Sequence, residues 1–264
     1  MRLGVLGPLL VTDSEDRTLS LRSLKTRVLL ANLLIHYGRV TPVDLLIEEL
    51  WADAAPKNMR SALQVYVSNL RKLLRAAGLS PEVATVSTHP SGYMIEVDKR
   101  EFDLARFEEG IEAARQAKDR GELDTASLLL KEGIGLWRGS ALADIDTAPT
   151  LRAEARRLNE LKITAQELHV GIDLELGRDQ EVIGDLYALI AKYPLREKLR
   201  EYLMIALHSQ GRPAEALQTF TAIRSELNEQ LGLEPGPKLQ KLQRMVLSRN
   251  LRPLESGLQL LRES

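Results

Sequence analysis

The chain has 264 residues and a formal net charge of −1, and hydrophobic residues make up 44% of it. This size and composition suit one large or two ordinary globular domains. Because the overall charge is close to zero, a nucleic-acid partner would have to be recognised by local clusters of charge. The absence of cysteine excludes disulfides, thiolate metal ligands and thiol nucleophiles. The N-terminus lacks a signal-peptide pattern, and no apolar run approaches the roughly 20 residues that span a bilayer, so we expect a cytoplasmic protein.

The first hundred residues combine strand and helix patterns. Short β-like runs that predict a small antiparallel sheet lie at 2–6, 9–12 and 18–21. Helices are predicted over 24–37, over a short segment that ends near 51–53, and over 57–77. In the short helix, Thr41 is expected to cap the N-terminus and Pro42 to take the first helical position. The turn His89-Pro90-Ser91-Gly92 then predicts a β-hairpin of strands 84–88 and 92–97.

The rest of the chain is predicted to be almost entirely helical, and it contains a repeat. Gly177-Arg178 and Gly211-Arg212 lie 34 residues apart. The apolar positions that follow stay in register: Val182, Leu186, Leu189 and Tyr193 match Ala216, Phe220, Ile223 and Leu227. A fainter copy begins at Gly121. A 34-residue period of paired helices is the tetratricopeptide pattern, whose stacked units form concave surfaces for partner proteins.

These patterns predict a mainly α protein with a small β component. We place the domains at 1–98 and 99–250, with a C-terminal tail at 251–264. The second half is expected to carry no helix whose charges are all of one sign.

The third predicted helix, 57–77, has an unusual distribution of charge. On a helical wheel, one continuous arc is apolar and predicts the face toward the core: Met59, Ala62, Leu63, Tyr66, Val67, Leu70, Leu73 and Leu74. The opposite arc is polar, and between Pro56 and Pro81 there are five basic residues and no acidic one. A solvated helix normally mixes both signs, because Glu–Lys pairs stabilise it.

A polar arc of this kind can read DNA. Its middle carries side chains suited to base edges, namely Ser61, Gln64, Val65, Ser68 and Asn69. Its margins carry cations suited to phosphates, namely Lys57, Arg60, Arg71, Lys72 and Arg75. Lys25 and Arg27 on the first helix are further phosphate candidates, although a solvated helix start explains them equally well.

The neighbouring elements favour DNA reading over an ordinary basic surface helix. A short helix and a turn precede this helix and a hairpin follows it, which is the order of a helix-turn-helix with a wing. His89 and Ser91 at the hairpin tip are the candidate wing contacts. An ordinary hairpin is the alternative, and for Tyr93 we prefer simple packing on the third helix.

Specific motifs link the chain to a known family. The first half resembles the OmpR-type winged helix of the Streptomyces antibiotic regulatory proteins (SARPs). The matching segments are Leu3–Pro8, Gly38–Val40 leading into Leu50-Trp51, Ala62–Leu74 and Ser91–Tyr93. The second half is similar to the bacterial transcriptional activation domain of that family. The matching segments there are Leu136–Gly139, Tyr193–Glu197, Leu203–Leu207, Gly211–Leu217 and Leu231–Gly236.

The resemblance implies a transcriptional activator of a biosynthetic gene cluster, such as one for an antibiotic. Such a protein would bind direct repeats upstream of promoters, as a homodimer on DNA. It would engage RNA polymerase holoenzyme through the sigma factor and the C-terminal domain of the alpha subunit. No cofactor and no metal are expected. We also expect residues 1–100 to fold and to bind DNA alone.

Three other functions compete with this one. An enzyme is disfavoured, because the four histidines are scattered and Gly133-x-Gly135 lacks the preceding strand of a nucleotide loop. Asp144-x-Asp146 could bind a cation, but a solvated loop is the simpler interpretation. A helical-repeat scaffold would not need the basic helix. A repressor could use the same DNA-binding half, so only the second half favours activation.

Overall fold

The structure is a computed structural model, and it describes residues 3–13, 15–51 and 58–248. The chain divides into two compact units. The first contains the residues up to Glu112 together with Glu132–Ile163, and the second contains Ala113–Lys131 together with the residues from Thr164 onward. Within the described ranges, no helix is long and apolar enough to cross a membrane.

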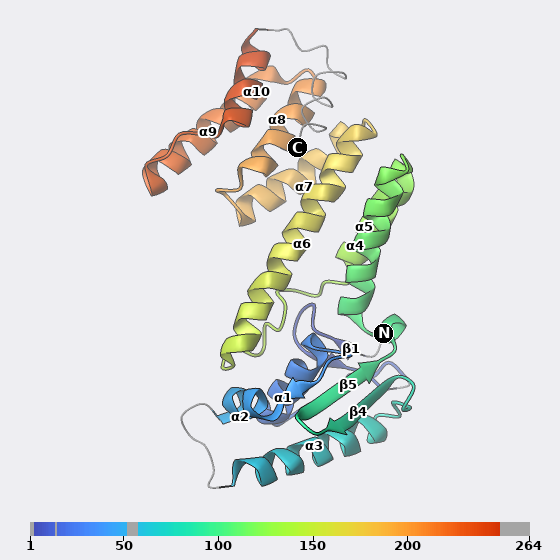
Figure 1. Cartoon of the computed structure of the whole chain (residues 1–264). Helices are drawn as coiled ribbons and strands as arrows, with labels where there is room; N and C mark the ends of the chain where they lie inside the picture. Colours follow the sequence, from blue (N-terminus) through green and yellow to red (C-terminus); the bar gives the residue numbers. More distant parts are fainter. Residues whose placement is uncertain (1–2, 14, 52–57, 249–264) are drawn as a thin grey trace. The chain divides into compact units, whose positions relative to one another are not determined.

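The N-terminal part of the first unit is a small α/β domain (Figure 1). Its helices are α1 (Leu24–Ile35), α2 (Val43–Trp51) and α3 (Met59–Ala76). Its strands are β1 (Leu3–Gly4), β2 (Leu10–Val11), β3 (Thr41–Pro42), β4 (Ala84–His89) and β5 (Gly92–Val97). Strands β1 and β2 pair with each other, and the second sheet has the antiparallel order β3-β5-β4. The β4–β5 hairpin lies over α3 (Figure 1), so the predicted winged helix-turn-helix is confirmed.

Two details of the sequence prediction were wrong. Thr41 and Pro42 do not begin α2; they form β3 and pair with Tyr93 and Gly92 of β5. The strand comes very close to Gly92, where an added Cβ would lie 2.0 Å from the Thr41 carbonyl oxygen. The third predicted N-terminal strand is reduced to a single bridge between Thr12 and Thr18.

Helix α3 forms as its sequence predicts. The Asn58 side chain caps its start by accepting a hydrogen bond from the Ser61 amide, and Gly78 follows its end with a φ of +69°. A glycine adopts this left-handed conformation at little cost, which stops the helix. The side chains buried on its inner face are Leu63, Val67, Leu70 and Leu74. Met59, in the first turn, is 38% exposed and lies at the margin of the core.

The remaining described chain consists of one short 3-10 helix and seven α-helices. The short helix is η1 (Lys99–Glu101). The others are α4 (Asp103–Asp119), α5 (Leu123–Gly135), α6 (Pro149–Glu175), α7 (Asp179–Lys192), α8 (Glu197–Ser209), α9 (Pro213–Leu231) and α10 (Pro237–Leu247). Gly177 and Gly211, which define the 34-residue period, end α6 and α8 with φ values of +75° and +70°. Six of the eight in-register residues are buried, as Leu186 and Phe220 illustrate, and Leu189 and Tyr193 are half-buried, so the predicted helical repeat is confirmed.

A buried carboxylate joins the N-terminus to the start of the helical half. Asp103, the first residue of α4, is 0% exposed. Its two oxygens accept hydrogen bonds from the amides of Val5 and Leu6 at 2.9 and 3.0 Å. The Arg138 guanidinium donates a third hydrogen bond at 3.0 Å. Burial raises the pKa of Asp103 more than these donors lower it, so the charge is costly to bury and depends on all three.

Arg138 extends this junction to the opening segment of the chain. Its guanidinium also donates to the Pro8 carbonyl at 2.7 Å, and its backbone amide donates to the Leu6 carbonyl at 2.8 Å. The site leaves no room at Gly4, where an added Cβ would lie 2.4 Å from the Arg138 guanidinium. The glycine and the arginine belong to two motifs that are far apart in the sequence, and the junction places them side by side.

This junction changes one expectation from the sequence. A fragment that ends at residue 100 would lack Asp103, and it would leave the buried amides of Val5 and Leu6 without their acceptors. The compact first unit also continues through Ile163 rather than ending at residue 98. We therefore no longer expect residues 1–100 to fold as the intact chain does.

We predict that Asp103→Asn lowers the free energy of unfolding of the full chain by about 1–3 kcal/mol, because an amide nitrogen would replace one of the buried acceptors. Urea unfolding measures the change. Glu109→Gln on the same helix is the control, since its ion pair with Lys99 is more than half exposed and should matter by less than about 1 kcal/mol. Equal stability of the Asp103→Asn and wild-type proteins would contradict this account of the junction.

Candidate nucleic-acid interface

The outward face of α3 presents the side chains that the sequence singled out for base reading. Ser61, Gln64, Val65, Ser68 and Asn69 are all exposed. Val65 is 59% exposed although it is apolar. A valine in this position gains nothing from the core, and it is available to an apolar group of a partner. The five residues therefore lie together on one accessible surface, and their role in base reading stays a prediction.

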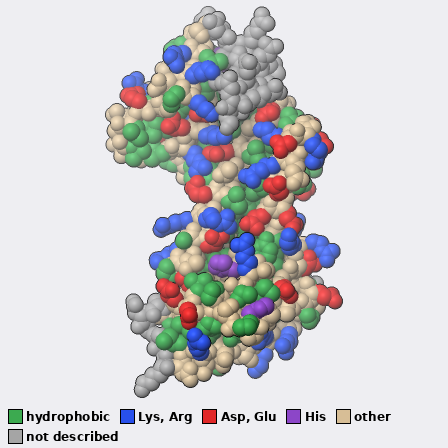
Figure 2. Space-filling view, in the orientation of Figure 1, with side chains coloured by type: hydrophobic (Ala, Val, Ile, Leu, Met, Phe, Trp, Pro, Cys, Tyr) green, Lys and Arg blue, Asp and Glu red, His purple; other side chains and the backbone are tan. Residues whose placement is uncertain are grey.

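Three of the predicted phosphate contacts are also accessible on α3. Lys72 and Arg75 are exposed and make no ion pair with the residues that the structure describes. Arg60 lies 3.6 Å from Asp44, but both side chains are more than 70% exposed, so a phosphate could replace that carboxylate. Figure 2 shows Lys and Arg side chains along the edge of the molecule that α3 occupies in Figure 1. Lys57 lies outside the described residues.

Arg71 differs from the other cations of α3 because its side chain is already engaged. Its Nε donates to the Val86 carbonyl at 2.9 Å, and its Nη2 donates to the Thr88 hydroxyl at 2.8 Å. Both acceptors belong to β4 of the hairpin. The sequence analysis grouped Arg71 with the phosphate contacts because it lies at the margin of the polar arc. A helical wheel does not show that the side chain can reach a strand.

Lys25 and Arg27 are engaged as well. The Lys25 ammonium lies 4.8 Å from the centre of the Trp51 ring, a cation–π contact. Arg27 forms an ion pair with Asp144 and donates to the backbone carbonyl of that residue. Asp144 also accepts a hydrogen bond from the Leu9 amide at 2.8 Å, so it fixes two segments of the first unit. The geometry favours a structural role for both cations.

The hairpin tip is compact and carries no cation. Strands β4 and β5 stay paired up to His89 and Gly92, which leaves Pro90 and Ser91 as the turn. The His89 ring nitrogen Nε2 lies 3.1 Å from the Ser87 hydroxyl, and Ser91 is exposed. No Lys or Arg occurs between Ala84 and Val97. A wing of this composition cannot be drawn to DNA by its own charge.

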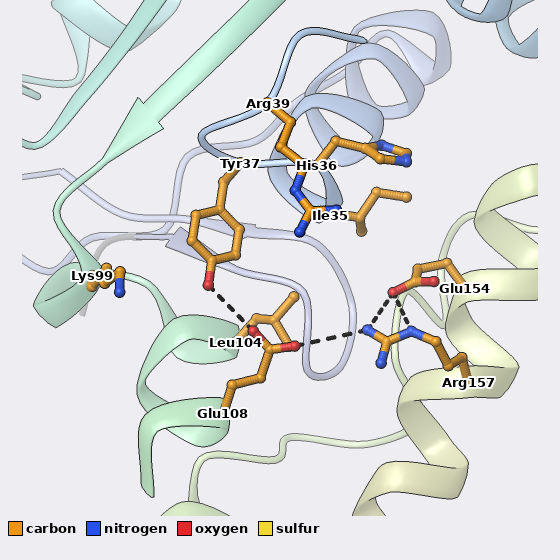
Figure 3. Close-up of a pocket in the computed structure, with 9 residues that line it drawn as sticks. All are labelled: Ile35, His36, Tyr37, Arg39, Lys99, Leu104, Glu108, Glu154 and Arg157. Carbon is orange, nitrogen blue, oxygen red and sulfur yellow. Dashed lines mark hydrogen bonds and ion pairs between the residues drawn. The ribbon is translucent and has the colours of Figure 1, made fainter. Parts of the chain in front are cut away.

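A pocket of about 550 Å³ in the first unit was not predicted from the sequence. Figure 3 shows its lining residues, which come from the end of α1 and the turn after it, and from η1, α4 and α6. Its two carboxylates have internal partners: Glu108 accepts from the Tyr37 hydroxyl at 3.2 Å, and Glu154 pairs with Arg157. Burial and the Glu108 charge raise the pKa of Tyr37. The pocket therefore presents no free acid–base pair.

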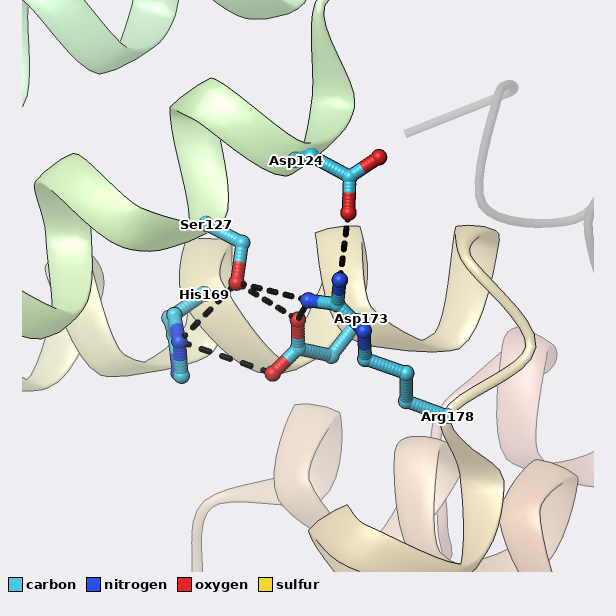
Figure 4. Close-up of polar contacts among 5 residues, drawn as sticks. All are labelled: Asp124, Ser127, His169, Asp173 and Arg178. Atoms are coloured by element: carbon cyan, nitrogen blue, oxygen red, sulfur yellow. Dashed lines mark hydrogen bonds and ion pairs between the residues drawn. The ribbon is translucent and has the colours of Figure 1, made fainter.

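A Ser–His–Asp cluster in the second unit does not form a catalytic triad. In a triad the histidine stands between the other two residues and uses a different ring nitrogen for each. In Figure 4, Ser127 donates directly to Asp173 at 2.7 Å, and the same His169 nitrogen lies 3.4 Å from Ser127 and 3.5 Å from Asp173. Arg178 donates to Asp173 at 2.9 Å. These contacts tie α5 to the end of α6, which is a structural role.

Among the described residues, no group of three or more His, Asp or Glu side chains is arranged to hold a metal ion. The expectation that no helix of the second half has charges of one sign was wrong, because α10 carries Lys238, Lys241 and Arg244 and no acidic residue. The first two of these already interact with other groups of the protein.

Comparison with known proteins identifies the family. Residues 16–95 match the model of the C-terminal domain of transcriptional regulatory proteins, and residues 102–247 match that of the bacterial transcriptional activator domain. The chain is 35% identical to the regulatory protein DnrI of Streptomyces peucetius over 94% of its own length and 92% of that protein. The chain belongs to the Streptomyces antibiotic regulatory protein family of transcriptional activators.

Other relatives are longer. The chain is 37% identical to the regulatory protein AfsR of Streptomyces coelicolor over 94% of its own length, but it spans only 24% of that protein. The solved structure of Mycobacterium tuberculosis EmbR, in complex with a low-affinity phosphopeptide, superposes with a TM-score of 0.90 at 32% identity. The match covers 99% of this chain and 69% of EmbR. This SARP is thus a DNA-binding transcription regulator with the fold that its sequence predicts.

We predict that Lys72→Ala in this SARP weakens binding to all duplexes about equally and lowers the slope of log affinity against log salt by roughly one unit, because one phosphate contact is lost. Fluorescence anisotropy at several salt concentrations measures the slope. Lys131→Ala, which removes an exposed charge of the second unit, should leave the slope unchanged. An unchanged slope for Lys72→Ala as well would exclude this contact.

Proposed function

We propose that this SARP is a sequence-specific activator of a biosynthetic gene cluster, and that it reads DNA with α3 in the major groove. One observation carries the proposal. The outward face of α3 exposes amides, hydroxyls and one methyl-bearing side chain in its middle, exposes cations at its margins, and holds no acidic residue. A major groove admits a helix of this kind, with its polar middle against the base edges.

Each group on this face is assigned a role that fits its chemistry. Gln64 and Asn69 pair with adenine through their amides, Ser61 and Ser68 accept or donate at either base, and Val65 contacts a thymine methyl. Arg60, Lys72 and Arg75 hold phosphates and fix the register of the helix on the duplex. His89 and Ser91 meet the adjacent groove or backbone from the wing.

The partners of the second half follow from the family. We propose that two copies bind direct repeats side by side as a homodimer on DNA, and that the repeat helices engage the sigma factor and the alpha subunit of RNA polymerase. Stacked helical repeats are suited to binding proteins, which supports this division. A cytoplasmic regulator without a cofactor and without catalytic activity fits these partners. The alternatives are a repressor that uses the same DNA-binding half and a helical-repeat scaffold.

We predict that Gln64→Ala relaxes the preference at one base position, with about 1–3 kcal/mol of discrimination lost there, while affinity for unrelated duplexes stays nearly the same. Selection from a randomised duplex pool, followed by sequencing, measures the preference. Gln218→Ala, an exposed glutamine of α9, serves as the control and should select the wild-type motif. If Gln64→Ala also selects that motif unchanged, Gln64 does not read a base.

The sign of regulation is tested by transcription in vitro. With RNA polymerase holoenzyme and a promoter that carries the selected duplex upstream, we expect the full chain to raise transcript yield several-fold, because it supplies a second contact for the polymerase. A drop in yield would support a repressor. If the chain selects no duplex and leaves transcription unchanged, the scaffold becomes the better interpretation.

A further inference from the structure

Arg71 links the recognition helix to the wing through two hydrogen bonds. Its guanidinium reaches the Val86 carbonyl with Nε and the Thr88 hydroxyl with Nη2, at 2.9 and 2.8 Å. The two acceptors belong to residues two positions apart on β4, and one guanidinium reaches both. A planar guanidinium that holds two acceptors fixes an orientation as well as a distance, which a lysine ammonium does not do.

The strand that Arg71 contacts is paired within its sheet on one side only. Strand β4 is an edge strand, since the sheet order is β3-β5-β4. An edge strand leaves part of its backbone unpaired, and Arg71 supplies a donor to one of these carbonyls. Thr88 is also the residue before His89, where the hairpin tip begins. A rotation of β4 about α3 would therefore move the tip directly.

The wing depends on such a link because it lacks cations of its own. Without Lys or Arg between Ala84 and Val97, the wing gains little from the charge of the phosphates. It contributes most to affinity when it already lies at the correct place as α3 docks, because binding then does not have to order it.

We propose that Arg71 is a positioning residue: it holds the wing at a fixed angle to α3 and thereby sets where the hairpin tip meets DNA, instead of binding a phosphate itself. The proposal rests on the proposed function of α3 as the DNA-reading helix. It separates Arg71 from Lys72, its neighbour in sequence, which is exposed and free of ion pairs to the described residues.

Four variants of the full chain test the proposal: Arg71→Lys, Arg71→Gln, Thr88→Val and the double variant of the last two. Binding to the duplex that the wild-type protein selects is measured at pH 8 over a range of salt concentrations. Arg71→Lys and Arg71→Gln should both weaken binding about tenfold with the salt slope unchanged. Glutamine removes the charge and lysine keeps it, but neither has the planar guanidinium that holds both acceptors. Thr88→Val should weaken binding about threefold, and the double variant should be no weaker than Arg71→Gln, because both changes break one interaction.

Controls separate this effect from loss of the fold. Thr85→Val removes another hydroxyl of β4, one that bonds to the Pro81 carbonyl, and it should bind like the wild type. Urea unfolding identifies any variant that fails to fold. If an Arg71 variant fails, the binding and footprint of Thr88→Val, the milder change, test the proposal instead. Hydroxyl-radical footprints of the Arg71 and Thr88 variants should lose protection at the wing edge of the site and keep it at the centre.

Three results would overturn the proposal. In the first, Arg71→Lys binds as tightly as the wild type, and the salt slope of Arg71→Gln falls by about one unit. Arg71 would then be a phosphate contact. Additive losses in the double variant, or an unaltered footprint at the wing edge, would break the link between Arg71 and the wing. If the wild-type protein selects no duplex at all, the proposed function fails first and this proposal fails with it.

Discussion

The buried carboxylate of Asp103 is the constraint on which the first unit depends. Its oxygens accept hydrogen bonds from the amides of two residues near the N-terminus and from the guanidinium of Arg138. Three segments that are distant in sequence therefore meet at this one carboxylate. A carboxylate without these donors would be costly to bury, and the donors without the carboxylate would be unsatisfied. The junction therefore forms as a whole. It makes the start of the helical half part of the structure that supports the winged helix.

This constraint bears on where the chain divides into domains. The family models separate the chain between residues 95 and 102, whereas the compact first unit includes Glu132–Ile163. The loop before α6 adds Asp144, which holds Arg27 of α1, and the backbone amide of Thr150 in α6 donates to Glu49 of α2 at 3.0 Å. The helix-turn-helix is thus supported by side chains and backbone from the helical half, and we propose that this support keeps α3 in place for DNA.

The sequence predicted those features that depend on local patterns. The period of apolar residues and the glycine at position 78 predicted α3, and the 34-residue repeat predicted paired helices after Gly177 and Gly211. The sequence prediction failed where a residue's conformation or contacts depend on a partner far away in the sequence. Thr41-Pro42 has the composition of a helix start and becomes a strand only because Gly92 lets the backbone approach. Arg27 seemed available to DNA because its partner is 117 residues away. Arg71 had the correct position on the helix, but its contact with the wing required the packed hairpin.

The central claim is that the outward face of α3 lies in the major groove of a specific site. The chain contains no cysteine, so a Val65→Cys variant would carry a single thiol, at the middle of that face, to which an iron–EDTA cleavage reagent can be attached. On the duplex that the protein selects, we expect this reagent to cut each strand within one narrow stretch inside each repeat. A Tyr187→Cys variant labelled in the same way, on the exposed surface of α7, should not cut there. Equal cutting by both proteins, or no cutting from position 65 on a bound duplex, would contradict the claim.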